Sequence, residues 1–105
     1  MTRPQDKPAR ERLPNRRACE TTAFEHSGTQ FRMTVGYFPD GRPGEIFLNH
    51  DRGDSLLDAL AHDAAILASL AMQFGASHQE IPHSLKRDSQ GTASSPIGAA
   101  LDLVR

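Results

Sequence analysis

The stretch that decides the fold is RACETTAFEHSGTQFRMTVGYF, residues 17–38. Two runs rich in β-branched and aromatic residues flank the dipeptide Ser27-Gly28. A two-residue turn containing glycine between such runs predicts a β-hairpin. If His26 faces Thr29 across this turn, the register of the whole hairpin is fixed.

That register separates apolar from polar side chains. Because side chains alternate along a strand, the hairpin has one apolar and one polar face, as a sheet with one buried side requires. The apolar face carries Phe24, Phe31, Met33, Val35 and Tyr37, and the other face carries Thr21, Glu25, Gln30, Arg32 and Thr34.

A third strand is predicted at residues 45–50, EIFLNH, after the turn residues Asp40-Gly41 and Pro43-Gly44. Ile46 and Leu48 should point to one side of the sheet and Phe47 to the other. No crossover segment separates this strand from the hairpin, so an antiparallel meander is the economical topology.

A long helix is expected to follow, capped by Asp54 or Ser55 and ending at Phe74 before the αL terminator Gly75. Four of its polar residues form one narrow stripe: Asp58, His62, Ser69 and Gln73. Nearly all its other residues are apolar, so we expect the helix to be covered on most of its circumference.

Two shorter helices are predicted after it. The segment 77–80, Ser-His-Gln-Glu, is a capping box that starts a helix near 78–87, with an irregular first turn at Pro82. Ser95 followed by Pro96 predicts the start of a third helix. The order βββααα describes an α+β fold: a three-stranded antiparallel meander packed on a long helix, followed by two shorter helices.

Residues 1–14 are expected to form a disordered basic arm and residues 15–105 a single domain. Residues 1–17 hold six bases and two acids, a net +4, whereas residues 18–105 hold six bases and eleven acids, a net −5. A basic arm on an acidic body allows weak binding to nucleic acid.

Cys19 is the one cysteine, which excludes an intrachain disulfide and a cysteine-based zinc site. The N-terminus lacks the apolar stretch of a signal peptide, and the apolar run at 64–72 is shorter than a membrane span. We therefore expect a cytoplasmic protein with no membrane association.

The candidates for chemistry are weak. Cys19 could be a reactive thiol, but no base is apparent beside it. His62 lies four residues after Asp58 on the same helical face, yet no metal-binding spacing is completed. We expect no catalytic residue, no metal site and no cofactor. A small enzyme that uses Cys19 or His62 stays as the alternative.

The segment FPDGRPGEIFLNHDRGDSLLDALAHDAAILASLAMQFG, residues 38–75, resembles the core of the TSCPD domain. The residues that carry the resemblance are Gly41, Pro43, Glu45 and Phe47. The motif that names the family would fall on residues 93–97, where Ser94 and Pro96 match while Ser95 replaces the cysteine and Ile97 the acid. That departure leaves the helix-start residues Ser95 and Pro96 and removes any thiol or metal role of the segment.

The resemblance implies a relationship to adenosylcobalamin-dependent, class II ribonucleotide reductases, in which this domain occurs near the C-terminus, and hence to deoxyribonucleotide metabolism. Ribonucleotide reduction needs a radical-bearing cysteine and a further redox pair, and this sequence has one cysteine. We therefore predict a non-catalytic accessory or interaction module.

The long helix is the predicted contact surface, because small side chains permit close helix approach and an uncovered apolar stripe marks an interface. The expected partner is a second copy of the chain or a reductase-like protein. The predicted interface residues are Ala61, Ala64, Ala65, Ala68, Ala71 and Phe47.

Overall fold

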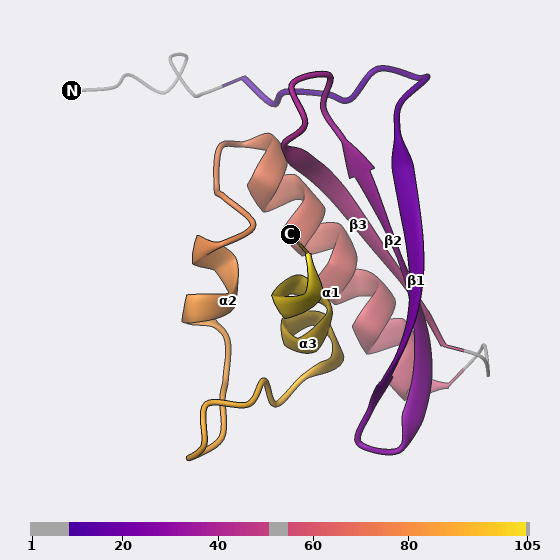
Figure 1. Ribbon diagram of the computed structural model, residues 1–105, viewed down its shortest axis with the longest axis vertical. Coiled ribbons are helices and arrows are strands. Elements are labelled where there is room, and N and C mark those ends of the chain that lie inside the picture. Colours follow the sequence, from indigo (N-terminus) through magenta and orange to yellow (C-terminus); the bar gives the residue numbers. More distant parts are fainter. Residues whose placement is uncertain (1–8, 51–54, 105) are drawn as a thin grey trace.

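The computed structural model describes residues 9–50 and 55–104. Three strands come first, β1 (Cys19–His26), β2 (Thr29–Tyr37) and β3 (Pro43–His50), followed by three helices, α1 (Leu56–Gln73), α2 (Glu80–Ser84) and α3 (Pro96–Leu103). The strands form one antiparallel sheet in the order β1-β2-β3, and the helices lie on one side of it (Figure 1). The predicted α+β fold and its βββααα order are confirmed.

The β1–β2 hairpin has the predicted register. Phe24 pairs with Phe31, and His26 pairs with Thr29. Ser27 and Gly28 both have positive φ, 51° and 79°, which is the backbone twist that a two-residue hairpin turn requires. The rings of Phe24 and Phe31 stack with their centroids 5.6 Å apart.

Strand β3 divides its side chains as predicted. Ile46 and Leu48 are fully buried under the helices, while Phe47 is 38% exposed on the opposite side. The pairing of β2 with β3 shifts register between Gly36 and Tyr37, so a bulge bends the sheet just before the turn into β3.

The hydrophobic core lies between the sheet and the helices. It is built from the inward side chains of β2 and β3 and from one face each of α1 and α3. Its buried members are Phe31, Met33, Val35, Ile46, Leu48, Ala61, Ala65, Ala68, Met72, Ile97, Ala100 and Leu101.

Helix α1 begins and ends close to its predicted bounds. The Ser55 hydroxyl accepts the N–H of Asp58, and Gly75 follows the helix with φ of 110°. Asp58 does not complete a capping box, because its carboxylate accepts the N–H of His50 at 3.1 Å. The other predicted cap, Asp54, lies outside the described residues.

Three residues of the polar stripe of α1, Asp58, Ser69 and Gln73, bond to the free edge of β3. The Ser69 hydroxyl accepts the N–H of Ile46 at 2.8 Å, and the Gln73 side chain donates to the carbonyl of Gly44 at 3.0 Å. Together with the bond that the His50 N–H donates to the Asp58 carboxylate, these contacts satisfy backbone groups along an edge strand that would otherwise be open to another strand.

This orientation corrects the expectation that α1 is covered on most of its circumference. Ser69, Gln73 and the adjoining alanines occupy the covered side, while His62 is exposed, so the side that faces solvent is mostly apolar, with Asp63 as its charged residue.

The two later helices cap the open end of the core. Helix α2 is shorter than the predicted 78–87, although its capping box forms with both reciprocal bonds between Ser77 and Glu80. Helix α3 starts as predicted, since the Ser95 hydroxyl accepts the N–H of Gly98. Arg87 ties the loop before α3 to the helix through two bonds to Asp102, at 2.6 and 2.9 Å.

The last part of the predicted arm contacts the body of the domain. Residues 9–14 lie against the body: Glu11 donates its N–H to the carbonyl of Gln73 at 2.8 Å, and its carboxylate accepts Arg42 at 3.0 Å. Leu13 also approaches Gly44. Residues 1–8 of the predicted arm lie outside the described residues.

Candidate interaction surface

The most unusual surface of the protein is the solvent-facing side of α1. Leu56, Leu60 and Leu67 are 76%, 61% and 67% exposed, and Phe74 at the end of the helix is 51% exposed. We call this set, with the partly exposed Leu57, Ile66 and Leu70, the outer α1 surface. Monomeric proteins expose single apolar side chains routinely, but a contiguous group along one helix is typical of an interaction site.

Phe47 of β3 extends this surface around the edge of the sheet. Together with Ile66 and Leu70 it lines a small hollow of about 180 Å³. Arg10, Glu45, Ser69 and Gln73 also line this hollow, so the surface between the helix and Phe47 is mixed in polarity.

The structure corrects the predicted interface residues. Ala61, Ala65 and Ala68 are no more than 6% exposed, because they pack against the sheet, so they cannot form a contact surface. Ala64 and Ala71 are half-buried at its margin, and Phe47 is available. The large leucines, which sequence reasoning left out, form the exposed side.

By length and hydropathy alone, α1 could also cross a membrane, and it is the one described helix with this property. Core helices of water-soluble domains meet the same criterion. Here Ser69 and Gln73 hold the helix against β3, and the buried alanines complete the contact with the sheet. These contacts identify α1 as a core helix with an uncovered side.

The surroundings of Cys19 and His62 give little support to a reactive role for either residue. Cys19 is exposed, and its described contact is a long one, 3.8 Å from Sγ to the carbonyl of Arg17. His62 is exposed on α1, and the described residues give it no hydrogen bond. Within residues 9–50 and 55–104 no cluster of three or more potential metal ligands occurs. Among the described residues, neither Cys19 nor His62 has a hydrogen bond to a side chain that could act as a catalytic base.

The family-motif residues have structural roles around the β2–β3 turn. Gly41 has φ of 93°, a conformation that glycine adopts without strain. Glu45 is buried and accepts both arms of the Arg17 guanidinium, with Nη2 at 3.1 Å from Oε1 and Nε bonded to Oε2. Pro43 begins β3 and is buried. These residues position the edge strand rather than form a reactive centre.

Gly36 makes room for the Glu45 carboxylate. A Cβ atom at position 36 would lie 2.7 Å from the Cγ of Glu45, closer than non-bonded carbons approach. The backbone at Gly36 passes directly over the ion pair between Glu45 and Arg17, so a side chain at this position would clash with the Glu45 carboxylate.

The residues of the motif that names the family, at positions 94–96, also have structural roles. Ser95 is the N-cap of α3, and Pro96 occupies its first turn. The carbonyl of Ser94 lies 3.2 Å from Nε2 of His26, so this loop is held against the end of β1.

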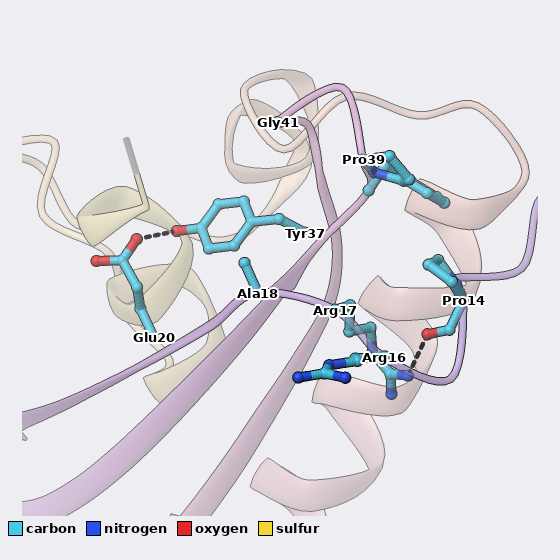
Figure 2. Close-up of a pocket in the computed structure, with 9 residues that line it drawn as sticks. Pro14, Arg16, Arg17, Ala18, Glu20, Tyr37, Pro39 and Gly41 are labelled. Atoms are coloured by element: carbon cyan, nitrogen blue, oxygen red, sulfur yellow. Dashed lines mark hydrogen bonds between the residues drawn. The ribbon is translucent and has the colours of Figure 1, made fainter.

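A hollow of about 470 Å³ is an open depression where the chain enters β1 (Figure 2). The Tyr37 hydroxyl donates to Glu20 at 2.7 Å, and this bond, more than burial, raises the pKa of Tyr37. Arg17 donates to the carbonyl of Pro14 and to Glu45, so among the described lining residues Arg16 is the cation that has no hydrogen bond or ion pair. One free arginine does not make an anion site.

The nucleic-acid alternative receives little support from the described residues. Phe38, one of the aromatic candidates for an open sheet face, is 3% exposed and lies under Arg42. The outer sheet face keeps Arg32 and Phe47 exposed, without a basic cluster around them.

A comparison of the sequence with known protein families agrees with the resemblance that residues 38–75 showed. The TSCPD domain family matches residues 3–102. The chain belongs to the TSCPD domain family.

Three curated relatives are vitamin B12-dependent ribonucleotide reductases. The identities are 39% over 69 residues for the protein of Rhodopirellula baltica, 37% over 71 residues for that of Agrobacterium fabrum, and 33% over 66 residues for that of Bradyrhizobium diazoefficiens. The matches cover 66%, 68% and 63% of this TSCPD chain, but 7%, 6% and 5% of the respective relatives. The chain is thus similar to a small piece of each reductase. No solved structure gives a significant match.

Proposed function

We propose that this TSCPD chain is a non-catalytic interaction module that docks onto a vitamin B12-dependent ribonucleotide reductase through the outer α1 surface. The observation that carries the proposal is the row of exposed leucines on a helix whose opposite side is fixed to β3. Burying such side chains is favourable by about 1.5–3 kcal/mol each when a partner covers them fully.

The similarity to pieces of reductases supports a reductase as the proposed partner. In those relatives the matching segment belongs to a much longer chain. The proposed role of the chain is therefore to contact such a reductase, in the deoxyribonucleotide metabolism of the cytoplasm.

The proposal excludes turnover by this chain alone. Ribonucleotide reduction requires a thiyl radical and a pair of reducing thiols, and the sequence supplies Cys19 alone. The enzymatic alternative would need an activated Cys19 or His62, and among the described residues neither side chain is hydrogen-bonded to a carboxylate or an imidazole.

The test mixes the purified chain with the vitamin B12-dependent ribonucleotide reductase of the same cell. We expect the two proteins to elute together in size-exclusion chromatography, and the chain alone to show no cobalamin-dependent turnover. Separate elution at micromolar concentrations of both proteins, or turnover by the isolated chain, would contradict the proposal.

A further inference from the structure

The outer α1 surface has the spacing of a coiled-coil seam. The residues along its centre are separated alternately by four and three positions: Leu56, Leu60, Asp63, Leu67, Leu70 and Phe74. This alternation is the a/d pattern with which one helix packs against another. At about 1.5 Å per residue the seam is about 27 Å long, which suits one partner helix rather than a flat protein surface.

One position breaks the apolar seam. Asp63 lies near its middle and is exposed, and within residues 9–50 and 55–104 it forms no hydrogen bond or ion pair. The positions beside the seam carry no charge: Leu57, Ala59, Ala64, Ile66, Ala71 and Gln73. Arg10, the cation at the C-terminal end of the helix, already donates to Gln73.

A helix that covers the leucines must also cover the Asp63 carboxylate. An ionised carboxylate removed from water without a cation costs several kcal/mol, because its lost hydration is not replaced. A polar residue at such a position is known to select the partner and the register of a helix pair.

Asp63 also discriminates between the possible occupants of the surface. In an antiparallel pair of two copies, Asp63 of each copy would lie opposite Leu67 of the other, so the two carboxylates would occupy neighbouring layers of the interface. In a parallel pair the two Asp63 carboxylates would lie directly opposite each other. Both arrangements bury two like charges, so a second copy is a poor match. An anionic lipid surface would meet the same negative charge.

We infer that the occupant is an amphipathic helix of the partner that carries a lysine or arginine opposite Asp63 within an otherwise apolar seam. This inference rests on the proposed function and adds to it the chemistry of the docking element. Leu60 and Leu67 on either side of the carboxylate would shield the ion pair from water, and the pair would set the register of the two helices.

The test uses three synthetic helical peptides of three heptads, with leucine at every a and d position except one central d position. That position is lysine in the first peptide, leucine in the second and glutamate in the third. Binding to the full-length chain is measured by fluorescence anisotropy. We expect the lysine peptide to bind at least about tenfold more tightly than the glutamate peptide, since a like-charge contact is penalised in a buried interface.

The Asp63→Lys variant should reverse this order and prefer the glutamate peptide. Because Asp63 is exposed, the variant should keep the wild-type thermal midpoint. Glu25→Lys makes the same charge change on the outer sheet face and should leave the order unchanged. Failure of all three peptides to bind, or an order that Asp63→Lys does not reverse, overturns the inference.

Two further outcomes would replace the partner helix by another occupant. A wild-type dimer in sedimentation at neutral pH would assign the surface to a second copy. Co-flotation of the chain with phosphatidylglycerol vesicles would assign it to lipid.

Failure of this inference can be told apart from failure of the proposed function. If the reductase co-elutes equally with the wild type and with Asp63→Lys, docking stands and the role of Asp63 falls. If the lysine peptide binds more tightly than the glutamate peptide and Asp63→Lys reverses that order, but the reductase elutes separately, the pairing of Asp63 with a cation stands and the proposed partner falls.

Discussion

The Ser69 hydroxyl bridges α1 and β3: it accepts the N–H of Ile46 at 2.8 Å and lies 3.0 Å from the carbonyl oxygen of the same residue. The carbonyl of Ala65, one helical turn earlier, is 2.9 Å away. Both residues of the bridge are buried. This contact decides which side of α1 faces the sheet and therefore which side faces solvent.

Removing this hydroxyl should destabilise the fold. Ser69→Ala leaves the buried N–H of Ile46 without a partner, which costs about 1–3 kcal/mol. Urea unfolding should show that loss as a lower midpoint, while the exposed Ser84→Ala in α2 should change stability little. Equal midpoints for Ser69→Ala and wild type would mean that the bridge does not hold the helix.

The strand register was predictable because it depends on neighbouring residues. The Ser27-Gly28 turn fixes the pairing of β1 with β2, and the alternation of Phe31, Met33 and Val35 selects the buried face. Local signals also gave the ends of α1, since Ser55 and Gly75 act within one helical turn.

The orientation of α1 was not predictable in the same way. A helical wheel shows that Ser69 and Gln73 share one side, but it does not show that an edge strand needs their hydrogen bonds. The usual expectation places polar residues outward and small apolar residues at contacts. Here the polar side chains of α1 form hydrogen bonds with the edge of the sheet, so Leu60 and Leu67 on the other side of the helix face solvent.

The close approach of Gly36 and Glu45 gives a second prediction. Gly36→Ala inserts a methyl group against the carboxylate and should cost about 1–3 kcal/mol, as overpacking in tight sites does. Combining it with Glu45→Ala should relieve the clash, so the double variant should lose less stability than the two single losses added together. Additive losses would show that the two residues do not interfere.

The ion pair between Arg87 and Asp102 predicts a pH dependence. The hydrogen bonds from Arg87 hold the pKa of Asp102 below its ordinary value. The stabilisation is therefore present above the unfolded pKa of about 3.9 and is lost as the pH falls through the lower folded pKa.

Asp102→Asn should consequently be less stable than wild type at pH 7, by a modest amount because the pair is partly exposed. The difference in free energy of unfolding should shrink as the pH falls below about 4. A difference that stays constant down to pH 2 would argue against the ion pair as its source.

The N-terminal segment provides a fourth prediction. Deleting residues 1–8 should leave the thermal midpoint unchanged, whereas deleting residues 1–14 should lower it. The longer deletion removes the backbone bond from Glu11 to Gln73 and the bonds of the Glu11 carboxylate with Arg42. Equal midpoints for the two deletions would show that residues 9–14 add no stability.

The central claim is that the outer α1 surface binds the reductase, and the most direct measurement compares two surface variants in a binding titration. Leu60→Gln/Leu67→Gln changes the outer α1 surface, and Glu25→Gln/Arg32→Gln changes the opposite side of the sheet, where both residues are exposed. We predict that the leucine variant folds as wild type and loses affinity for the vitamin B12-dependent ribonucleotide reductase by about 100-fold, or about 2.7 kcal/mol, while the sheet variant binds as wild type. Wild-type affinity in the leucine variant, or loss of affinity in the sheet variant alone, would contradict the claim.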